Sequence, residues 1–299
     1  MTKVKHVLGL SGGKDSAALA IYMRETYPEL EIDYFFTDTG KELPEVYDYL
    51  NDLEAFLGRK IHRLNDGKGF DYWLKEYNNF LPSGQQRWCT IQMKLVPFEN
   101  WIKPFLNDGY EIVSYVGIRA DEPSRDGYQS TNEKVVARLP FAEDGLVKQD
   151  ILNILEHSGL GLPEYYKWRS RSGCTFCFYQ RKIEWVRLME EHPALFEEAK
   201  SYEQVLNSSN GEPNGDLDTK DKPVQEQYFW LGKGTPLTTL EDPVRIKQIK
   251  DNHAKRLARF KKRIRRNALI DSDAIIDTVN LDDIYDDVEG GGACTVCYK

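Results

Sequence analysis

The stretch LGLSGGKDS, residues 8–16, decides the fold of this chain. It closes an apolar run, Val4 to Leu10, and leads into residues of helical composition from Ser16 to Arg24. We therefore expect a strand, a tight glycine-rich turn and a helix whose positively polarised end faces the turn. Backbone N–H groups in such a turn point at an anion, and phosphate is the anion that this arrangement favours.

The loop differs from the commonest phosphate-binding loop. A Walker A loop has the order G-x-x-x-x-G-K-[ST], with lysine directly before the hydroxyl residue. Here the order is Ser-Gly-Gly-Lys-Asp-Ser. Lys14 can neutralise developing charge, and Asp15 can hold a magnesium ion or position the loop. The alternative is a strand-to-helix turn capped by its serines. The residues expected to bind phosphate are Ser11, Gly12, Gly13, Lys14, Asp15 and Ser16.

Strand-like and helix-like segments alternate after this loop. The expected strands are Val4–Leu10, Ile32–Phe36, Lys60–Leu64 and Ile112–Ile118. The expected helices include Pro44–Leu57, Phe98–Leu106, Lys148–His157 and Ile183–Lys200. This alternation predicts an α/β fold, a twisted parallel sheet with helices on both faces. Polar clusters follow Leu10, Phe36 and Ile118, and ligands of such sheets bind at the carboxyl ends of the strands. We expect the three clusters to converge on one site.

The segment Ser11–Ser16 resembles the PP-loop of the N-type ATP pyrophosphatases. That superfamily includes phosphoadenosine phosphosulfate (PAPS) reductases, tRNA thiolases and DNA phosphorothioation enzymes. Over residues 4–180, further segments are similar to those of the PAPS-reductase-like branch. These segments are Thr37–Gly40 with Pro44-Glu45, Cys89-Thr90 with Lys94 and Pro97, Gly117–Arg119 with Asp121, Glu122, Ser124 and Arg125, Leu139-Pro140, and Gly173–Cys177.

The resemblance implies a PP-loop/HUP-like fold that binds an adenine nucleotide with Mg²⁺. In the ATP-using branch it implies cleavage between the α- and β-phosphates, with pyrophosphate as a product. Lys14, Asp15 and Arg119 are then the expected catalytic residues. The nucleotide-binding residues implied in addition to the loop are Asp38, Thr39, Gly117, Arg119 and Arg125.

Two departures from the PAPS reductases bear on the reaction. This chain keeps the full ATP-type loop and lacks the C-terminal ECG element that those reductases have. We therefore expect an ATP-dependent, adenylating sulfur-transfer enzyme, nearest to the DNA phosphorothioation and tRNA thiolation enzymes. One alternative is a PAPS or adenosine phosphosulfate reductase that releases sulfite. Another is a non-catalytic nucleotide-binding subunit of a defence or modification complex.

The five cysteines are an odd number, which argues against a disulfide framework and for metal or redox chemistry. The two-residue spacing of Cys174 and Cys177 lets both thiolates reach one metal centre. The resemblance implies that Cys89 joins them on a [4Fe-4S] cluster with one open iron, with zinc as the alternative. The fourth ligand could be Cys294 or Cys297. That terminal pair could also shuttle sulfur or electrons, bind metal in a partner complex, or have no role.

The C-terminal part of the chain is divided by charge. We expect a PP-loop domain over residues 1–200 and, over 201–299, an extension with a linker, a helix and the cysteine tail. Arg245–Arg266 contains eleven Lys or Arg and one acid, whereas Asp271–Glu289 contains eight acids and no base. The basic helix favours contact with nucleic acid phosphates. It could instead pair with the neighbouring acids or be a solvated face. A sulfur donor or a modification-complex protein is a further expected partner.

The bulk composition sets outer limits. Of 299 residues, 40% are hydrophobic and 29% charged, which is ordinary for a globular protein. No apolar run reaches the roughly 20 residues that span a bilayer, and no secretory signal peptide is recognisable, so we expect no membrane contact and a cytoplasmic location. The net charge of −8 excludes a globally basic nucleic-acid binder.

Overall fold

The computed structural model describes residues 3–123, 125, 130–170, 173–203, 228–232 and 234–267, with the backbone alone at 263–267. These residues form two compact units. Unit 1 contains the described residues up to 70 and from 88 to 175, and unit 2 contains those from 71 to 87 and from 176 onward. The predicted boundary at residue 200 stays a prediction.

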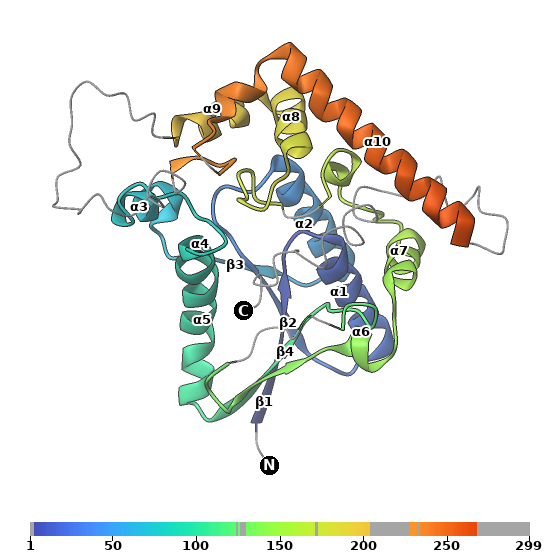
Figure 1. Ribbon diagram of the computed structural model, residues 1–299. Coiled ribbons are helices and arrows are strands. Elements are labelled where there is room, and N and C mark those ends of the chain that lie inside the picture. Colours follow the sequence, from blue (N-terminus) through green and yellow to red (C-terminus); the bar gives the residue numbers. More distant parts are fainter. Residues whose placement is uncertain are drawn as a thin grey trace. The chain divides into compact units, whose positions relative to one another are not determined.

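Unit 1 is built on a five-stranded sheet in which every pair of neighbouring strands is parallel (Figure 1). The strand order is β3-β2-β1-β4-β5, so β1 occupies the centre. The strands are β1 (Lys3–Leu10), β2 (Ile32–Thr37), β3 (Ile61–Leu64), β4 (Tyr110–Tyr115) and β5 (Val135–Arg138). The predicted parallel α/β fold is confirmed. Because the loop after β1 leaves the middle of the sheet, it can be reached by the segments that follow β2 and β4.

Helices flank this sheet and form most of unit 2. Those of unit 1 are α1 (Lys14–Thr26), α2 (Pro44–Leu57), α4 (Trp88–Thr90), the π-helical turn η1 (Ile91–Leu95), α5 (Val96–Asn107), α6 (Pro140–Glu143), α7 (Lys148–His157) and the 3₁₀ turn η2 (Glu164–Lys167). Helix α3 (Gly69–Glu76) begins in unit 1 and ends in unit 2. Unit 2 also contains α8 (Lys182–Glu191), α9 (Pro193–Ser201), η4 (Leu237–Leu240) and α10 (Pro243–Asn267).

The sequence predicted one helical segment over Ile183–Lys200, and the structure has two helices, α8 and α9, there. The break falls at His192, directly before Pro193. Proline has no N–H to donate, and its ring disfavours helical geometry in the residue before it. The new helix therefore starts on the proline, which is tolerated in a first turn.

The sheet is buried on both faces. On one face, α5 contributes Phe98 and Ile102 to a buried cluster with Val7 and Phe35. Leu8 is also fully buried, and it points to the opposite face because successive strand residues alternate. Figure 1 shows α5 on one side of the strands and α1 and α2 on the other. This packing fixes β1 and thereby the loop that follows it. Among the described residues, no helix is long and apolar enough to cross a membrane.

Candidate nucleotide-binding site

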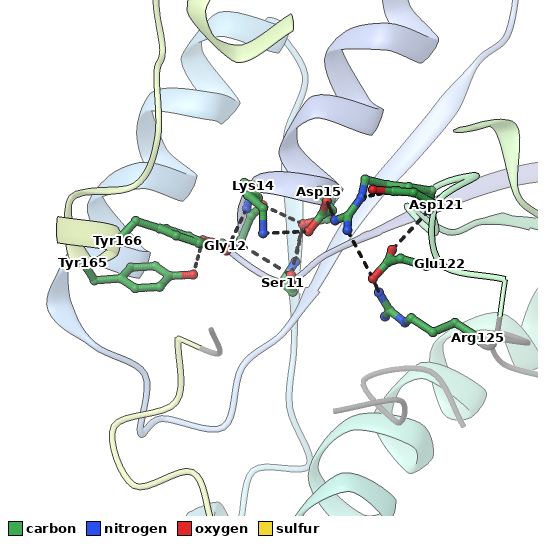
Figure 2. Close-up of polar contacts among 12 residues, drawn as sticks. Ser11, Gly12, Lys14, Asp15, Asp121, Glu122, Arg125, Tyr165 and Tyr166 are labelled. Carbon is green, nitrogen blue, oxygen red and sulfur yellow. Dashed lines mark hydrogen bonds and ion pairs between the residues drawn. The ribbon is translucent and has the colours of Figure 1, made fainter. Parts of the chain in front are cut away.

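The loop between β1 and α1 is held in shape by its two serines (Figure 2). The backbone N–H of Ser11 donates to Oγ of Ser16 over 3.1 Å, and the two serine Oγ atoms lie 3.1 Å apart. Oγ of Ser16 also donates to the carbonyl oxygen of Gly13 over 3.2 Å. The serine hydroxyls expected to face a phosphate thus bond to each other and to the loop backbone.

Gly12 and Gly173 both pack closely against one side chain, that of Val46 in the first turn of α2. Gly12 has φ of +71°, a left-handed conformation that favours glycine. A Cβ atom on Gly12 would lie 2.5 Å from Cγ1 of Val46, and one on Gly173 would lie 2.3 Å from Cγ2. Val46 therefore separates the loop from the segment that carries Cys174, with no room for a side chain on either glycine.

Two tyrosines of η2, about 150 residues further along the sequence, contact the loop (Figure 2). The Tyr165 hydroxyl donates to the carbonyl oxygen of Gly12 over 3.2 Å. The Tyr166 hydroxyl accepts the backbone N–H of Lys14 over 3.4 Å, and the Lys14 ammonium lies 5.2 Å from the centre of the Tyr166 ring. The first N–H of α1 and the Lys14 side chain, both suited to a phosphate, thus both contact Tyr166.

Asp15 lies between two cations. Its Oδ2 is 3.4 Å from the Lys14 ammonium, and its Oδ1 accepts from Nη1 of Arg119 over 2.8 Å. Burial alone would raise the pKa of Asp15, but the charges of Lys14 and Arg119 outweigh it and leave the pKa below its usual value. Gly117 allows the chain after β4 to approach: a Cβ there would lie 2.9 Å from the Asp15 carbonyl oxygen.

Arg119, which follows β4, is the centre of an ion-pair network with Asp15, Asp121 and Glu122. The residue is only 5% exposed. Its Nε donates to Asp121 over 2.8 Å, its backbone N–H donates to Glu122 over 3.2 Å, and Glu122 also accepts from Arg125 over 2.8 Å. Burial would lower the pKa of Arg119, but the nearby carboxylates, Asp15 first, raise it, so the guanidinium stays charged.

Asp38 and Thr39 follow β2, as the sequence predicted, and each is engaged locally. Asp38 Oδ1 accepts from the Tyr47 hydroxyl over 2.8 Å and from the backbone N–H of Gly40 over 2.9 Å. Burial, then the bond to Asp38, raises the pKa of Tyr47. The Thr39 hydroxyl donates to Oε1 of the buried Glu42 over 2.9 Å. These bonds rigidify the turn that faces the site from β2.

Glu42 links this turn to the central cysteine segment. Residues Glu42 and Cys174 form an antiparallel bridge, and the Cys174 thiol donates to Oε1 of Glu42 over 3.3 Å. The Lys94 ammonium lies 3.7 Å from the same sulfur atom. Cys89 lies in α4 of unit 1, and Cys177 belongs to unit 2. The possible fourth ligands, Cys294 and Cys297, lie outside the described residues.

The described part of the chain contains no group of three or more His, Cys, Asp or Glu side chains placed to hold a metal ion. Both carboxylate oxygens of Asp15, the expected magnesium ligand, contact cations. The iron–sulfur cluster, its zinc alternative and the magnesium ion therefore stay predictions.

The structure joins several of the expected nucleotide-binding residues in one ion-pair network, which runs from Lys14 through Asp15 and Arg119 to Glu122 and Arg125. It places Asp38 and Thr39 in a second group with Glu42 and Cys174. Sequence reasoning missed Tyr165 and Glu42. No local pattern marks Tyr165, because 153 residues separate it from its partner Gly12.

Together, the central β1, the glycine loop and the polar strand ends define an α/β domain built to bind a ligand at the carboxyl edge of its sheet. Residues 5–138 match the model of the phosphoadenosine phosphosulfate reductase domain. The resemblance to the PAPS reductases seen in the sequence is thus confirmed over these residues.

Sequence identity to individual proteins is low. An uncharacterized protein of Methanocaldococcus jannaschii is 30% identical over 216 residues, which are 67% of this chain and 41% of that protein. The chain thus spans less than half of that relative's length.

Among solved structures, the PAPS reductase from Candida auris in complex with phosphate has a TM-score of 0.46 and 13% identity. The match covers 58% of this chain and 82% of that one. The U34-tRNA thiolase NcsA from Methanococcus maripaludis, with its [4Fe-4S] cluster, has a TM-score of 0.40 and 14% identity over 71% of this chain and 76% of that one.

Proposed function

We propose that this protein binds ATP at the loop Ser11–Ser16 and cleaves it between the α- and β-phosphates. In this reaction an acceptor oxygen attacks the α-phosphorus, the bond to the bridging oxygen of pyrophosphate breaks, and the adenylated acceptor remains. The observation that carries the proposal is Lys14, a 6% exposed cation at the N-terminus of α1 beside a glycine loop. A buried ammonium beside oriented backbone N–H groups suits the charge that develops on departing pyrophosphate.

The neighbouring charges have separate roles in this proposal. Lys14 contacts the phosphates, for which it exchanges its contact with the Tyr166 ring. Arg119 already bonds Asp15 and Asp121, so it positions Asp15 and keeps positive charge beside the loop. A magnesium ion, when bound, would add neutralising charge, but no step is derived through it or through an iron–sulfur cluster.

The finer proposal is sulfur transfer. Adenylation turns an acceptor oxygen into a leaving group, and sulfide can then form a bond to that position as the bond to AMP breaks. The full loop and the cysteine segment beside it support this chemistry. A nucleic acid is the proposed acceptor, held by the exposed cations of α10, and a sulfur-donor or modification-complex protein is the proposed partner. We also propose that the reaction takes place in the cytoplasm.

Lys14→Met tests the role of the loop. With protein purified anaerobically, we expect ATP-dependent release of pyrophosphate when DNA or tRNA is supplied with sulfide. Lys14→Met should lower that rate by about 100-fold or more, as expected for loss of one charge-stabilising donor. The matched control is Lys103→Met, which removes an exposed lysine of α5. Pyrophosphate release that survives in Lys14→Met, or none with any acceptor, contradicts the proposal.

The match to the PAPS reductase domain favours one second candidate, a reductase that releases sulfite from PAPS or adenosine phosphosulfate. In that reaction Cys294 or Cys297 would be the nucleophile. Sulfite release from either nucleotide, lost in Cys297→Ser, would select this candidate. Tight ATP binding without turnover would instead select a non-catalytic nucleotide-binding subunit.

A further inference from the structure

Arg169 is a buried arginine that follows η2, and neither the loop motif nor the network of Arg119 includes it. The residue is 1% exposed. Its Nη2 donates to the carbonyl oxygen of Cys174 over 2.6 Å. Within the described residues, Nε and Nη1 of this guanidinium have no hydrogen-bond partner. Three of its five N–H groups, one on Nε and two on Nη1, are therefore unused.

The charge of Arg169 is also uncompensated. Among the described residues no carboxylate forms an ion pair with it, and the centre of the Trp168 ring lies 6.0 Å from the guanidinium carbon. By contrast, Arg119, nearly as buried, bonds two carboxylates at 2.8 Å. An unpaired buried cation is strongly unfavourable, because burial removes its hydration and nothing replaces it. Such a group calls for an anionic partner, and the described residues do not supply one.

The position of Arg169 indicates which anion that is. Burial raises the pKa of the Tyr165 hydroxyl well above its usual value, and the positive charges of Arg169 and Lys14 both act against this shift. Both cations therefore lie close enough to act on the hydroxyl that bonds Gly12. On its other side, Arg169 bonds the backbone of Cys174. The guanidinium thus contacts the cysteine segment directly and acts through its charge on Tyr165, whose hydroxyl bonds the glycine loop.

We propose that Arg169 binds an oxyanion of the ligand held at the glycine loop, a phosphoryl or sulfuryl group that reaches from Lys14 toward Cys174. This inference rests on the proposed binding of a nucleotide at the loop. The N-terminus of α1 and Lys14 hold the phosphate chain from one end, and Arg169 supplies unused N–H donors at the other. Arginine suits such a group because its planar donors match the spacing of two oxyanion oxygens.

The test measures binding of ATP, pyrophosphate and adenosine to the full chain by calorimetry, with PAPS as a sulfuryl-bearing probe. In Arg169→Met we expect affinity for ATP and pyrophosphate to fall about 10- to 100-fold, the range for a lost bond to a charged group. Affinity for adenosine should not change, because adenosine has no oxyanion. Arg169→Lys keeps the charge but loses the planar donors, so its affinity for ATP and pyrophosphate should lie between those of the wild type and Arg169→Met. If Arg169→Met lowers the affinity for PAPS more than the affinity for ATP, the sulfuryl group is the part of the ligand that Arg169 binds.

The control is Arg138→Met, which removes an exposed arginine paired with Glu143. A structural role for Arg169 predicts a lower melting temperature of the ligand-free variant with unchanged affinity for all probes, and that result overturns the inference. Our proposal predicts a ligand-free melting temperature no lower than that of the wild type, because methionine removes an unpaired buried charge. If Arg169→Met does not fold, wild-type affinities of Arg169→Lys for all probes would likewise overturn the inference. Wild-type protein that binds no nucleotide at all would instead refute the proposed function.

Discussion

Lys14 makes two contacts with Tyr166 that a bound phosphate would have to replace. Its backbone N–H donates to the tyrosine hydroxyl, and its ammonium lies over the ring. A phosphate at the N-terminus of α1 needs that N–H and attracts that ammonium. The tyrosine hydroxyl therefore stands where a phosphate oxygen would bind, and the ligand must compete with it.

Tyr166→Phe removes this competition at the backbone N–H while it keeps the ring. We expect affinity for ATP to rise about 2- to 10-fold, which corresponds to the net value of one neutral hydrogen bond. Equilibrium binding of ATP to the two proteins measures this change, with Tyr72→Phe, an exposed tyrosine of α3, as the control. A weaker affinity in Tyr166→Phe would mean that the hydroxyl contacts the ligand directly.

Some residues of the site can be predicted from a local sequence motif, and others cannot. Lys14 and Asp15 belong to a contiguous loop, and their position after an apolar run marks them from the sequence alone. The residues next to Arg169 in the sequence do not distinguish it from other arginines. Its proposed role follows from its burial without a counter-ion among the described residues, which only the structure shows. Glu42 is likewise defined by its contact with Cys174, which is 132 residues away.

At the scale of elements, Glu203 fastens the end of α9 to later parts of unit 2. Its carboxylate accepts the backbone N–H of Trp230 over 3.0 Å and that of Leu237 over 2.7 Å. Burial raises the pKa of Glu203 from its usual 4.5 to about 7, although the two backbone bonds act in the opposite direction. The folded protein thus holds a proton on Glu203 at a pH where the unfolded chain has released it.

The stability of unit 2 should therefore depend on pH through Glu203. Between pH 4.5 and about 7 the folded state binds more protons than the unfolded state at this group, so its contribution to stability falls as the pH rises. Thermal unfolding measured from pH 5 to 8 should show this decline in the wild type and a smaller decline in Glu203→Gln. Glu191→Gln, at the exposed end of α8, is the control. Equal pH dependence in all three proteins would contradict the role of Glu203.

Elements with strong local signals matched their predictions closely. Helix α2 runs from Pro44 to Leu57 as expected, because a first-turn proline and a left-handed Gly58 mark its two ends. Strand β5 was missed: its four residues, Val135–Arg138, are too few to show a period and are defined by pairing with β4. The break between α8 and α9 was foreseeable from Pro193, but the apolar pattern on both sides concealed it.

At the scale of the whole molecule, a net charge of −8 coexists with the strongly basic α10. Lys255, Arg259 and Lys262 are at least partly exposed and fall at helical spacing on one face of this helix. An acidic chain repels nucleic acid except where such a face meets it, so binding should depend steeply on salt. The acidic segment expected to compete for these cations, Asp271–Glu289, lies outside the described residues.

Replacement of Lys255, Arg259 and Lys262 by alanine tests this surface. We expect weaker binding of duplex DNA at low salt, and a slope of log K against log salt that is shallower by about 3, near one unit for each lost phosphate contact. Fluorescence anisotropy across a salt series measures both quantities. The control replaces Lys60, Lys103 and Lys134, three exposed lysines of unit 1. A slope unchanged in the α10 variant would assign DNA binding, if any, to another surface.

Val46 couples the positions of two segments of unit 1, the glycine loop and the segment that carries Cys174. One of its methyl groups would clash with a side chain on Gly12, and the other would clash with a side chain on Gly173. Because both glycines pack closely against one valine, a shift of the glycine loop toward Val46 would also press on the turn beside Cys174.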